Sequence, residues 1–220
     1  MVTRKRTKEI IGDRFGTRYL PFAKLGTYFD TGVDSMAALD AANLDYEYQI
    51  DIPTANYKKN IDGTEFIQRD QGDTRAVIRP AVAGKYDTPE WIGNVTDRYT
   101  LVQNKEVADF IQPLTERYPV KVAGELGNGK TIFYVLAGAE KQFKKYGKNE
   151  HINTYILVKD GKNGDNGLSI GLFAVRVACS NMQMFSKRYL SAYTIKHTAS
   201  IRENADLIVD SMHKISELED

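Results

Sequence analysis

Apolar and polar residues alternate along much of the chain, a pattern that predicts β-strands joined by turns. Four short strands are expected in the first half, at residues 44–52, 64–69, 75–82 and 90–95. The turn sequence DQGD joins the second of them to the third, and the Asn-, Lys- and Gly-containing residues 53–63 are expected to form a loop.

Two hairpins are predicted in the second half of the chain. Strands 120–126 and 130–138 flank the turn sequence GNG, and strands 152–160 and 168–179 flank the loop GKNGDNG. The basic segment 140–151 between these hairpins is expected to be a loop or a short helix. A last strand is expected at residues 192–197.

Helical periodicity occupies four further segments, at residues 34–43, 104–119, 180–190 and 200–218. Asp34 and Asn104 are the expected N-caps of the first two helices, and Pro113 marks a kink or break in the second. Hairpins followed by helices are typical of an α+β fold rather than of repeated βαβ units. We therefore expect an antiparallel sheet built from β-hairpins, with helices packed on one face.

The domain organisation follows from the same pattern. Residues 1–24 are predicted to be a basic, flexible N-terminal arm, because they hold seven Lys or Arg residues and little apolar periodicity. Residues 25–220 are predicted to form a single α+β domain that ends in an amphipathic helix.

Composition is that of an ordinary globular protein, with 42% hydrophobic and 27% charged residues and a net charge of +1. No apolar run approaches the ~20 residues of a membrane-spanning helix, and the N-terminus lacks the apolar stretch of a secretory signal. The single cysteine, Cys179, excludes an intramolecular disulfide and a cysteine-based zinc site. These features favour a cytoplasmic protein without membrane contact.

Few residues have the arrangement that catalysis or metal binding requires. The three histidines, His151, His197 and His213, have no metal-ligand spacing, so we predict no metal, no cofactor and no catalytic residue. Cys179 with His197 as its base is the one enzymatic alternative, and a buried structural role for Cys179 is the more common arrangement.

Charge is sorted by segment. Residues 166–202 contain no Asp or Glu but carry five cations, whereas residues 25–75 and the end of the chain are acidic. Within this basic stretch Arg176 lies on a predicted strand between Ala174 and Ala178. Strand alternation assigns Phe173 to the core face and Leu172, Ala174 and Arg176 to an open face, where a long cation would reach a bound anion.

Cations interleaved with aromatic residues are typical of proteins that bind single-stranded nucleic acid, because cations follow the phosphates and rings stack on bases. The predicted nucleic-acid-binding residues share this character: Arg176, Lys187, Arg188 and Lys196 with Phe185, Tyr189 and Tyr193, assisted by Lys144, Lys145 and the arm. The structural alternative is that Arg176 pairs with a carboxylate of the acidic segment and that the tyrosines belong to the core.

Several stretches of the chain resemble a phage- and plasmid-encoded family, the Domain of Unknown Function number 932. The resemblance covers most of the chain and rests on Gly93, Val95, Tyr99 and Asn104 of one motif and Arg176, Cys179 and Asn181 of another. It implies a mobile-element origin, often near replication and recombination genes, but no reaction. The succession of hairpins and a helix is also similar, at the level of fold, to Rad-type single-strand annealing proteins, which are oligomeric rings.

Two functions of different classes are consistent with these features. The first is a phage protein that binds single-stranded DNA as a homo-oligomer. A stronger version of this hypothesis adds that the protein anneals single strands for recombination. The second is a small interaction module that binds or inhibits a host protein through a sheet edge and a tyrosine-rich surface. We expect no enzymatic activity under either hypothesis.

Overall fold

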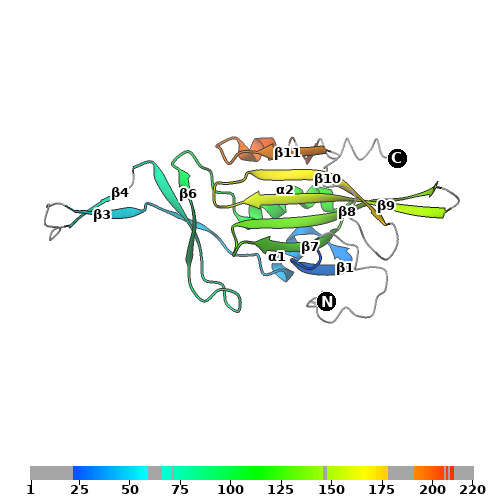
Figure 1. The fold of residues 1–220 in the computed structure, drawn as a ribbon, viewed down its shortest axis with the longest axis horizontal. Coiled ribbons are helices and arrows are strands. Elements are labelled where there is room, and N and C mark those ends of the chain that lie inside the picture. Colours follow the sequence, from blue (N-terminus) through cyan, green and yellow to red (C-terminus); the bar gives the residue numbers. More distant parts are fainter. Residues whose placement is uncertain are drawn as a thin grey trace.

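The computed structural model describes residues 22–58, 66–70, 72–145, 148–177, 191–205, 207, 209 and 210. Within these residues, the strands and helices in chain order are β1 (Thr27–Val33), α1 (Ser35–Ala41), β2 (Gln49–Asp51), β3 (Thr54–Lys58), β4 (Phe66–Asp70), β5 (Thr74–Arg79), β6 (Glu90–Thr96), α2 (Asn104–Thr115), β7 (Val120–Leu126), β8 (Thr131–Lys145), β9 (Lys148–Gly161), β10 (Leu168–Val177) and β11 (Ser191–Ile195). A further helical segment begins at Ile201 (Figure 1).

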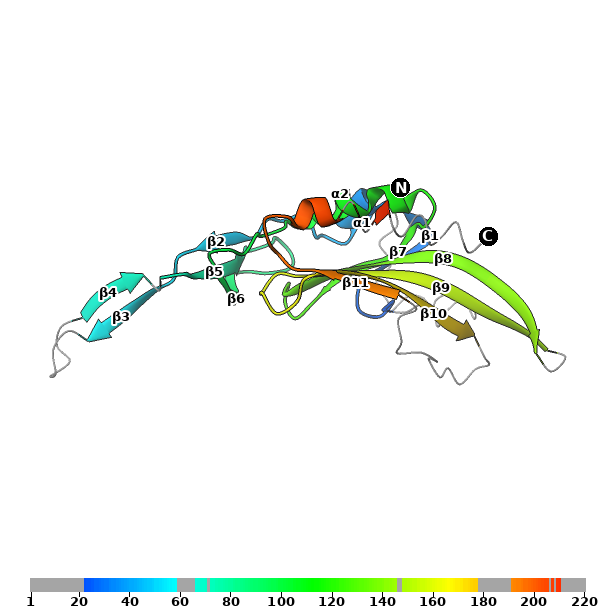
Figure 2. The same ribbon diagram turned by 90° about the horizontal axis from the view of Figure 1, so that it is seen from above.

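The main body is a six-stranded antiparallel sheet in the order β1-β7-β8-β9-β10-β11. Figure 2 shows α1, α2 and the segment after Ile201 on one side of this sheet. The predicted α+β class, with helices on one face of an antiparallel sheet, is therefore confirmed. From β7 to β11 each strand pairs with the next strand in the chain, so this part of the sheet is a meander. β1 is the edge strand beside β7.

Two smaller groups of strands extend the molecule beyond the main sheet. β5 pairs with β2 and β6, and β3 pairs with β4 in a separate two-stranded ribbon (Figure 1). Two of the strands predicted in the first half of the chain, at residues 64–69 and 75–82, are present as β4 and β5, and each pairs with a different partner, β4 with β3 and β5 with β2 and β6. The prediction of a loop over residues 53–63 is wrong at Thr54–Lys58, which is β3.

The hairpin of β8 and β9 is longer than the sequence pattern suggested. The two strands stay paired from Thr131 with Gly161 to Lys145 with Lys148, so residues 140–145 and 148–151 are strand rather than loop or helix. Figure 2 shows this hairpin curving away past the neighbouring strands. The prediction failed because charged residues without an apolar face can still pair when both strands continue from a buried part of the sheet.

The predicted hairpin of residues 120–126 and 130–138 is present as β7 and β8, and its turn has the backbone conformation that the sequence GNG favours. Gly127, Asn128 and Gly129 all have positive φ, at 61°, 57° and 85°. Glycine adopts this region without steric cost and asparagine tolerates it better than most residues, so the sequence GNG determines the hairpin.

The helix starts follow capping rules. The Asp34 side chain accepts a hydrogen bond from the Ala37 amide at 2.8 Å, as predicted for α1. For α2 the cap is Gln103 rather than Asn104, because Glu106 reaches back to the Gln103 amide in a capping box. Asn104 is instead the first helical residue and is buried, where its amide donates to Leu44 O at 2.9 Å.

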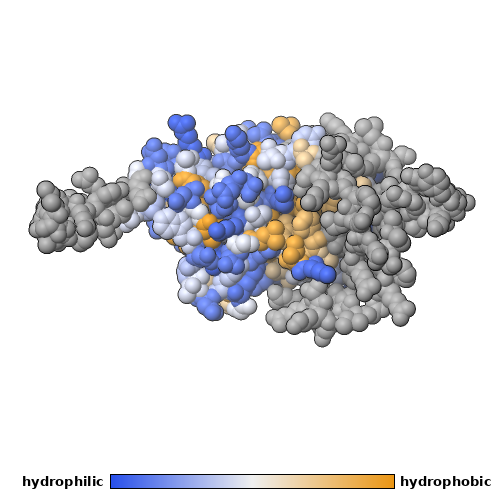
Figure 3. Space-filling model, in the orientation of Figure 1, coloured by the Kyte–Doolittle hydropathy of each residue, from blue (hydrophilic) through white to orange (hydrophobic). Residues whose placement is uncertain are grey.

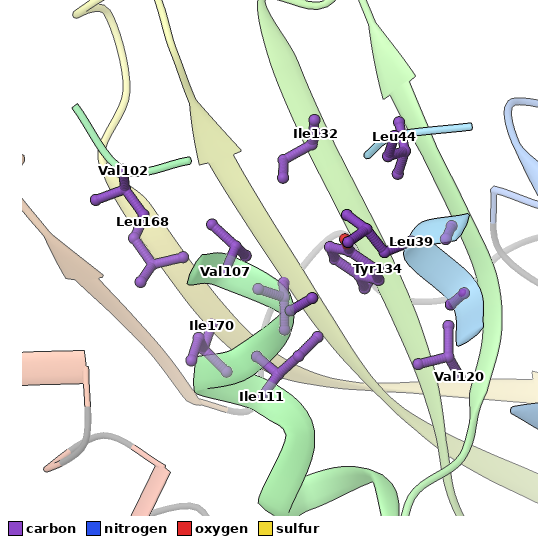
Figure 4. Packing of buried hydrophobic residues seen from close by; sticks show 14 of the residues in the cluster. Leu39, Leu44, Val102, Val107, Ile111, Val120, Ile132, Tyr134, Leu168 and Ile170 are labelled. Carbon is purple, nitrogen blue, oxygen red and sulfur yellow. The ribbon is translucent and has the colours of Figure 1, made fainter. Parts of the chain in front are cut away.

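Both faces of the sheet carry buried apolar residues. The larger cluster lies between the sheet and the helices, and Figure 4 shows Val107 and Ile111 of α2 pointing toward the strands that carry Tyr134 and Ile170. A smaller cluster lies on the opposite face and includes Phe133. Burying each such side chain stabilises the fold by roughly 1.5–3 kcal/mol.

The two clusters correct one step of the sequence argument. Leu172 is buried in the helix-side cluster and Phe173 in the smaller one, so the face predicted to be open at Leu172 is covered. The sequence missed this because β10 is apolar on both faces, and alternation alone does not say which face the helices cover.

The two ends of the described chain both pack on the main sheet through apolar residues. Phe22 at the end of the predicted arm packs on Phe133, with ring centroids 5.5 Å apart, and Ala23 is buried. In the C-terminal segment Ile201 and Ala205 are buried in the helix-side cluster, as the amphipathic pattern predicted. Residues 1–21, the predicted helix 180–190 and residues 211–220 lie outside the described part of the chain.

Candidate nucleic-acid interface

A pocket of about 680 Å³ lies at one end of the six-stranded sheet. It is formed where β8 begins, β9 ends, β10 begins and β11 ends, with the turn after β6 on one side. We call it the sheet-end pocket. Figure 1 shows that this end of the sheet is the one opposite the tip of the β8–β9 hairpin.

The floor of the sheet-end pocket is a polar part of the face without helices. Lys159 pairs with Phe133 on one side and with Ser169 on the other, and Ser169 pairs with Thr194. Because strand residues alternate, Lys159 shares its face with Leu157 of the smaller apolar cluster rather than with the helix side. Figure 3, drawn from the side of Figure 1, shows an apolar area in mid-molecule and hydrophilic residues toward the end nearer β6.

Three cations line the sheet-end pocket. Arg98 and Lys196 are exposed and Lys159 is half-buried, and among the described residues none of the three forms an ion pair. Asp165 is the single acid in the lining, and its carboxylate accepts a hydrogen bond from the Asn163 side chain. The described lining therefore carries an excess of positive charge, which favours an anionic ligand.

A cluster of charged residues is buried directly beneath the pocket. The Lys162 Nζ lies 2.5 Å from Asp160 Oδ2, and His197 Nε2 lies 2.8 Å from Asp160 Oδ1. All three side chains are at most 2% exposed. Lys162 also donates to Val102 O at 2.6 Å, so its ammonium is held by both a carboxylate and a carbonyl.

The contacts of His197 hold its ring in place. Its Nδ1 lies 3.1 Å from Thr100 O, and its Nε2 faces the Asp160 carboxylate at 2.8 Å. The ring is therefore positioned on both sides, by a backbone carbonyl and by a buried carboxylate.

Burial and pairing act in opposite directions on these groups. Burial alone raises the pKa of Asp160, but the charges of Lys162 and His197 outweigh it and hold that pKa below its ordinary value. Burial lowers the pKa of Lys162, and Asp160 only partly opposes this shift. An ionised Asp160 carboxylate beside the Lys162 ammonium is the consistent arrangement.

The Tyr99 ring joins the buried cluster to the pocket wall. It stacks on His197 with ring centroids 4.8 Å apart and an interplanar angle of 6°, and its hydroxyl donates to Gly161 O at 3.2 Å. Tyr99 and His197 both line the sheet-end pocket. Burial and the negative charge of Asp160 raise the pKa of Tyr99, so the ring stays neutral at ordinary pH.

The loop between β9 and β10 is seated by a glycine contact. A Cβ on Gly93 of β6 would lie 2.6 Å from both the Cβ and the backbone oxygen of Asn163, closer than real Cβ atoms approach. Gly93 thus lets this loop lie against β6, and the loop residues 164–167 form part of the lining. The sequence therefore needs glycine at this position to build the pocket.

A second polar cluster lies at the junction between the main sheet and the three-stranded sheet. Glu125 of β7 accepts from Tyr46 at 2.5 Å and from Tyr86, and pairs with Lys85 at 2.9 Å. The Arg79 guanidinium lies 3.4 Å from the centre of the Tyr86 ring. Glu125 is engaged by three side chains of this cluster, so we assign the cluster a structural role in joining the sheets.

The residues predicted from the sequence are not brought together at one place. Lys196 lines the sheet-end pocket, whereas Tyr193 pairs with Ile170 of the helix-side cluster and lies on the other face of β11 at 40% exposure. Lys144 and Lys145 lie near the hairpin tip. At about 3.3 Å per residue, the strand between Lys148, the partner of Lys145, and Lys159 spans about 36 Å.

The remaining predicted residues are described incompletely or not at all. The backbone of Arg176 pairs with Ile152 in β10, and its side chain lies outside the description. Outside the described part of the chain lie Phe185, Lys187, Arg188, Tyr189 and Cys179. For the alternative of a Cys179–His197 pair, both nitrogens of His197 are already occupied by Thr100 and Asp160.

Sequence reasoning missed Arg98, Lys159 and the Asp160–Lys162 pair. The pair carried a readable pattern: Ile156, Val158, Asp160 and Lys162 share one strand face, so an apolar row ends in two opposite charges. Arg98 carried none, because it lies in a turn and reaches the pocket only through the tertiary fold.

The described residues contain neither a metal-ligand cluster nor a membrane-spanning helix. No group of three or more His, Cys, Asp or Glu side chains in that part of the chain is arranged to hold a metal ion. No helix within it has the length and apolar character needed to cross a membrane.

Comparison with known proteins gives one match. Residues 91–219 match the family described as Domain of unknown function (DUF932). No curated protein and no solved structure matches. The likeness to Rad-type annealing proteins therefore has no homologue behind it.

Proposed function

The chain belongs to the family described as Domain of unknown function (DUF932), which assigns no activity, and we propose that it binds single-stranded nucleic acid, most simply DNA. The observation that carries the proposal is a set of three cations around the sheet-end pocket that form no ion pair with any described residue: Arg98, Lys159 and Lys196. The proposal implies a protein of the cytoplasm that acts by binding and needs no catalytic group.

The charge of the pocket suits the backbone of a nucleic acid. Phosphates are recognised by cations that have no competing carboxylate, and by hydroxyl groups that donate hydrogen bonds. The described lining has both: besides the cations it contains the hydroxyls of Thr131, Ser169, Thr194 and Thr198.

The aromatic component of the proposal is smaller than the sequence suggested. Tyr99 lies in the pocket wall and offers a ring edge to a base or sugar, and Tyr193 is exposed on the other face of β11. The stacking roles of Phe185 and Tyr189, and the phosphate contacts of Arg176, Lys187, Arg188, Lys144 and Lys145, remain predictions from the sequence.

A salt titration tests the proposal. Binding of a long fluorescent oligothymidylate should weaken steeply with salt, because each neutralised phosphate adds about 0.7 to the slope of log K against log salt. The triple variant Arg98→Ala/Lys159→Ala/Lys196→Ala should lower that slope by about 2 units.

Lys105→Ala is the matched control, since Lys105 is an exposed lysine of α2 on the helix side. Its slope and affinity should equal those of the wild type. The absence of measurable binding by the wild type at low salt would exclude the proposal, as would a triple variant with an unchanged slope.

A second candidate function, binding of a host protein, is favoured by a different surface. In and beside the three-stranded sheet, Ile50, Ile52 and Trp91 are exposed at 41%, 46% and 54%. The Trp91 indole donates its N–H within its own strand, to Gly93 O and Asn94 Oδ1, which leaves an apolar ring for contact. Recovery of one stoichiometric protein partner, retained after nuclease treatment and lost with Trp91→Ala, would support this candidate.

A further inference from the structure

We propose that the sheet-end pocket takes the terminal phosphate of a nucleic acid strand rather than an internal phosphodiester. This inference rests on the proposed function and names the part of the ligand that the pocket holds.

The arrangement of the cations is the first argument. Arg98 comes from the turn after β6, Lys159 from the sheet floor and Lys196 from the end of β11. They approach from three separate elements around one pocket and do not follow one strand as a row. A chain that passes through needs cations along a track, whereas a chain end needs them around a point.

The charge count is the second argument. A phosphomonoester carries about −1.5 to −2 at pH 7, and an internal diester carries −1. Three cations against the single carboxylate of Asp165 leave an excess of two positive charges in the described lining. The pocket thus matches a dianion better than a diester.

The surroundings of the pocket are the third argument. The β9–β10 loop, seated on β6 through Gly93, and the turn that carries Arg98 form parts of its lining. Its volume of about 680 Å³ falls within the range of small-ligand sites, which is roughly 300–1,000 Å³. The space suits one terminal nucleotide, with the Tyr99 ring in the wall.

Three oligothymidylates of one length test the inference: one with a 5′-phosphate, one with a 3′-phosphate and one with hydroxyls at both ends. We expect one phosphorylated strand to bind about tenfold more tightly than the hydroxyl strand, the effect of about one charge-assisted hydrogen bond. Arg98→Ala should reduce that preference to near unity, whereas Lys105→Ala should preserve it.

The outcomes separate this inference from the function on which it rests. Equal affinity for all three strands, with binding intact, overturns the terminal-phosphate site and leaves the proposed function standing. A preference that survives in both Arg98→Ala and Lys196→Ala places the phosphate elsewhere and also overturns it. Failure of all three strands to bind at low salt overturns both.

Discussion

Single residues beneath the pocket carry charges where burial makes charge costly. Asp160 and Lys162 are fully buried and directly paired, and His197 completes the cluster. Replacing a buried ion pair by apolar residues is often neutral for stability, so such a pair is weak evidence that stability was its purpose. Its position under the sheet-end pocket connects it to the pocket wall, since it positions the His197 ring against which Tyr99 stacks.

Removing one member of the cluster should be costly. In Lys162→Met the Asp160 carboxylate stays buried without its ammonium partner, and we expect a loss of about 3–5 kcal/mol in the free energy of unfolding. Urea denaturation followed by circular dichroism measures this loss. Lys159→Met is the matched control at the end of β9, and because Lys159 is half-buried and forms no ion pair with a described residue it should change stability by about 0.5 kcal/mol or less.

Individual tyrosines should make the stability of the protein depend on pH in the alkaline range. The pKa values of Tyr46, Tyr48, Tyr86, Tyr99 and Tyr134 are all raised, in each case mainly by burial. Unfolded tyrosines release protons near pH 10, whereas the four largely buried residues, Tyr46, Tyr48, Tyr99 and Tyr134, retain theirs in the folded state. Their contribution is therefore complete below pH 10 and is lost as the pH rises above it, by up to about 1.4 kcal/mol per pH unit for each of these four groups. Tyr86 is more exposed, so solvent screening makes its contribution smaller.

A spectrophotometric titration checks this expectation. Tyrosinate absorbance should rise in two phases, and the second phase, from the buried tyrosines, should coincide with the loss of circular dichroism. Ionisation of all 13 tyrosines in one phase, with the secondary structure intact, would contradict it.

At the scale of elements, the sequence predicted the turns and helix starts that are determined by a few neighbouring residues. The β7–β8 hairpin follows from GNG, and α1 follows from the Asp34 cap. The pairing of β5 with β2 and β6 was not readable from the sequence, because a strand's partner is chosen by tertiary packing. The edge strand β1 was missed for a related reason, since its burial pattern shows no clean alternation.

The candidate site was less predictable than the fold. Lys196 was selected from its basic surroundings and does line the pocket, but Arg98 and Lys159 come from segments with ordinary charge balance. A pocket built from the ends of several strands has no continuous sequence pattern, because each strand contributes only one or two residues.

The seating of the β9–β10 loop yields a prediction at this scale. Gly93→Ala places a methyl group against Asn163, so either the loop shifts or β6 moves. We expect a loss of about 1–3 kcal/mol in stability and weaker oligonucleotide binding than in the wild type. Gly72→Asn is the control: nothing lies within 4 Å of Gly72, and Asn tolerates its φ of 58°, so both measurements should stay near wild type.

The β8–β9 hairpin offers another element to alter. Replacing residues 142–151 by Asn-Gly would keep the pair of Lys141 with Ile152 and remove Lys144, Lys145 and Lys148. The described apolar clusters lie nearer the body of the sheet, so thermal stability should change little. If the hairpin contacts phosphates, the slope of the salt titration should fall by about 2 units, and an unchanged slope would remove Lys144 and Lys145 from the interface.

At the scale of the whole molecule, the described parts form an extended body. Figure 2 shows the β3–β4 ribbon at one end and the β8–β9 hairpin at the other, with the helices over the middle of the sheet. Long projections are well suited to contact with a polymer or with further copies of the chain. Both uses agree with the proposed function, and annealing would require several copies on one strand.

Mass in solution distinguishes simple coating from an annealing assembly. We expect light scattering to give a multimer of defined size when a long oligonucleotide is added, and an annealing assay with two complementary strands to accelerate at that stoichiometry. A monomer that coats the strand without accelerating pairing would support binding alone.

The order of the main sheet has a consequence for how the chain folds. From β7 to β11 every pairing joins neighbouring strands, so this part closes only short loops and is expected to form early. β1 instead pairs with β7 across the two smaller strand groups and both helices, which makes it the last and least cooperative addition. Hydrogen exchange should therefore find the amides of β1 the first to open, leaving the edge of β7 transiently free to accept a strand from another molecule.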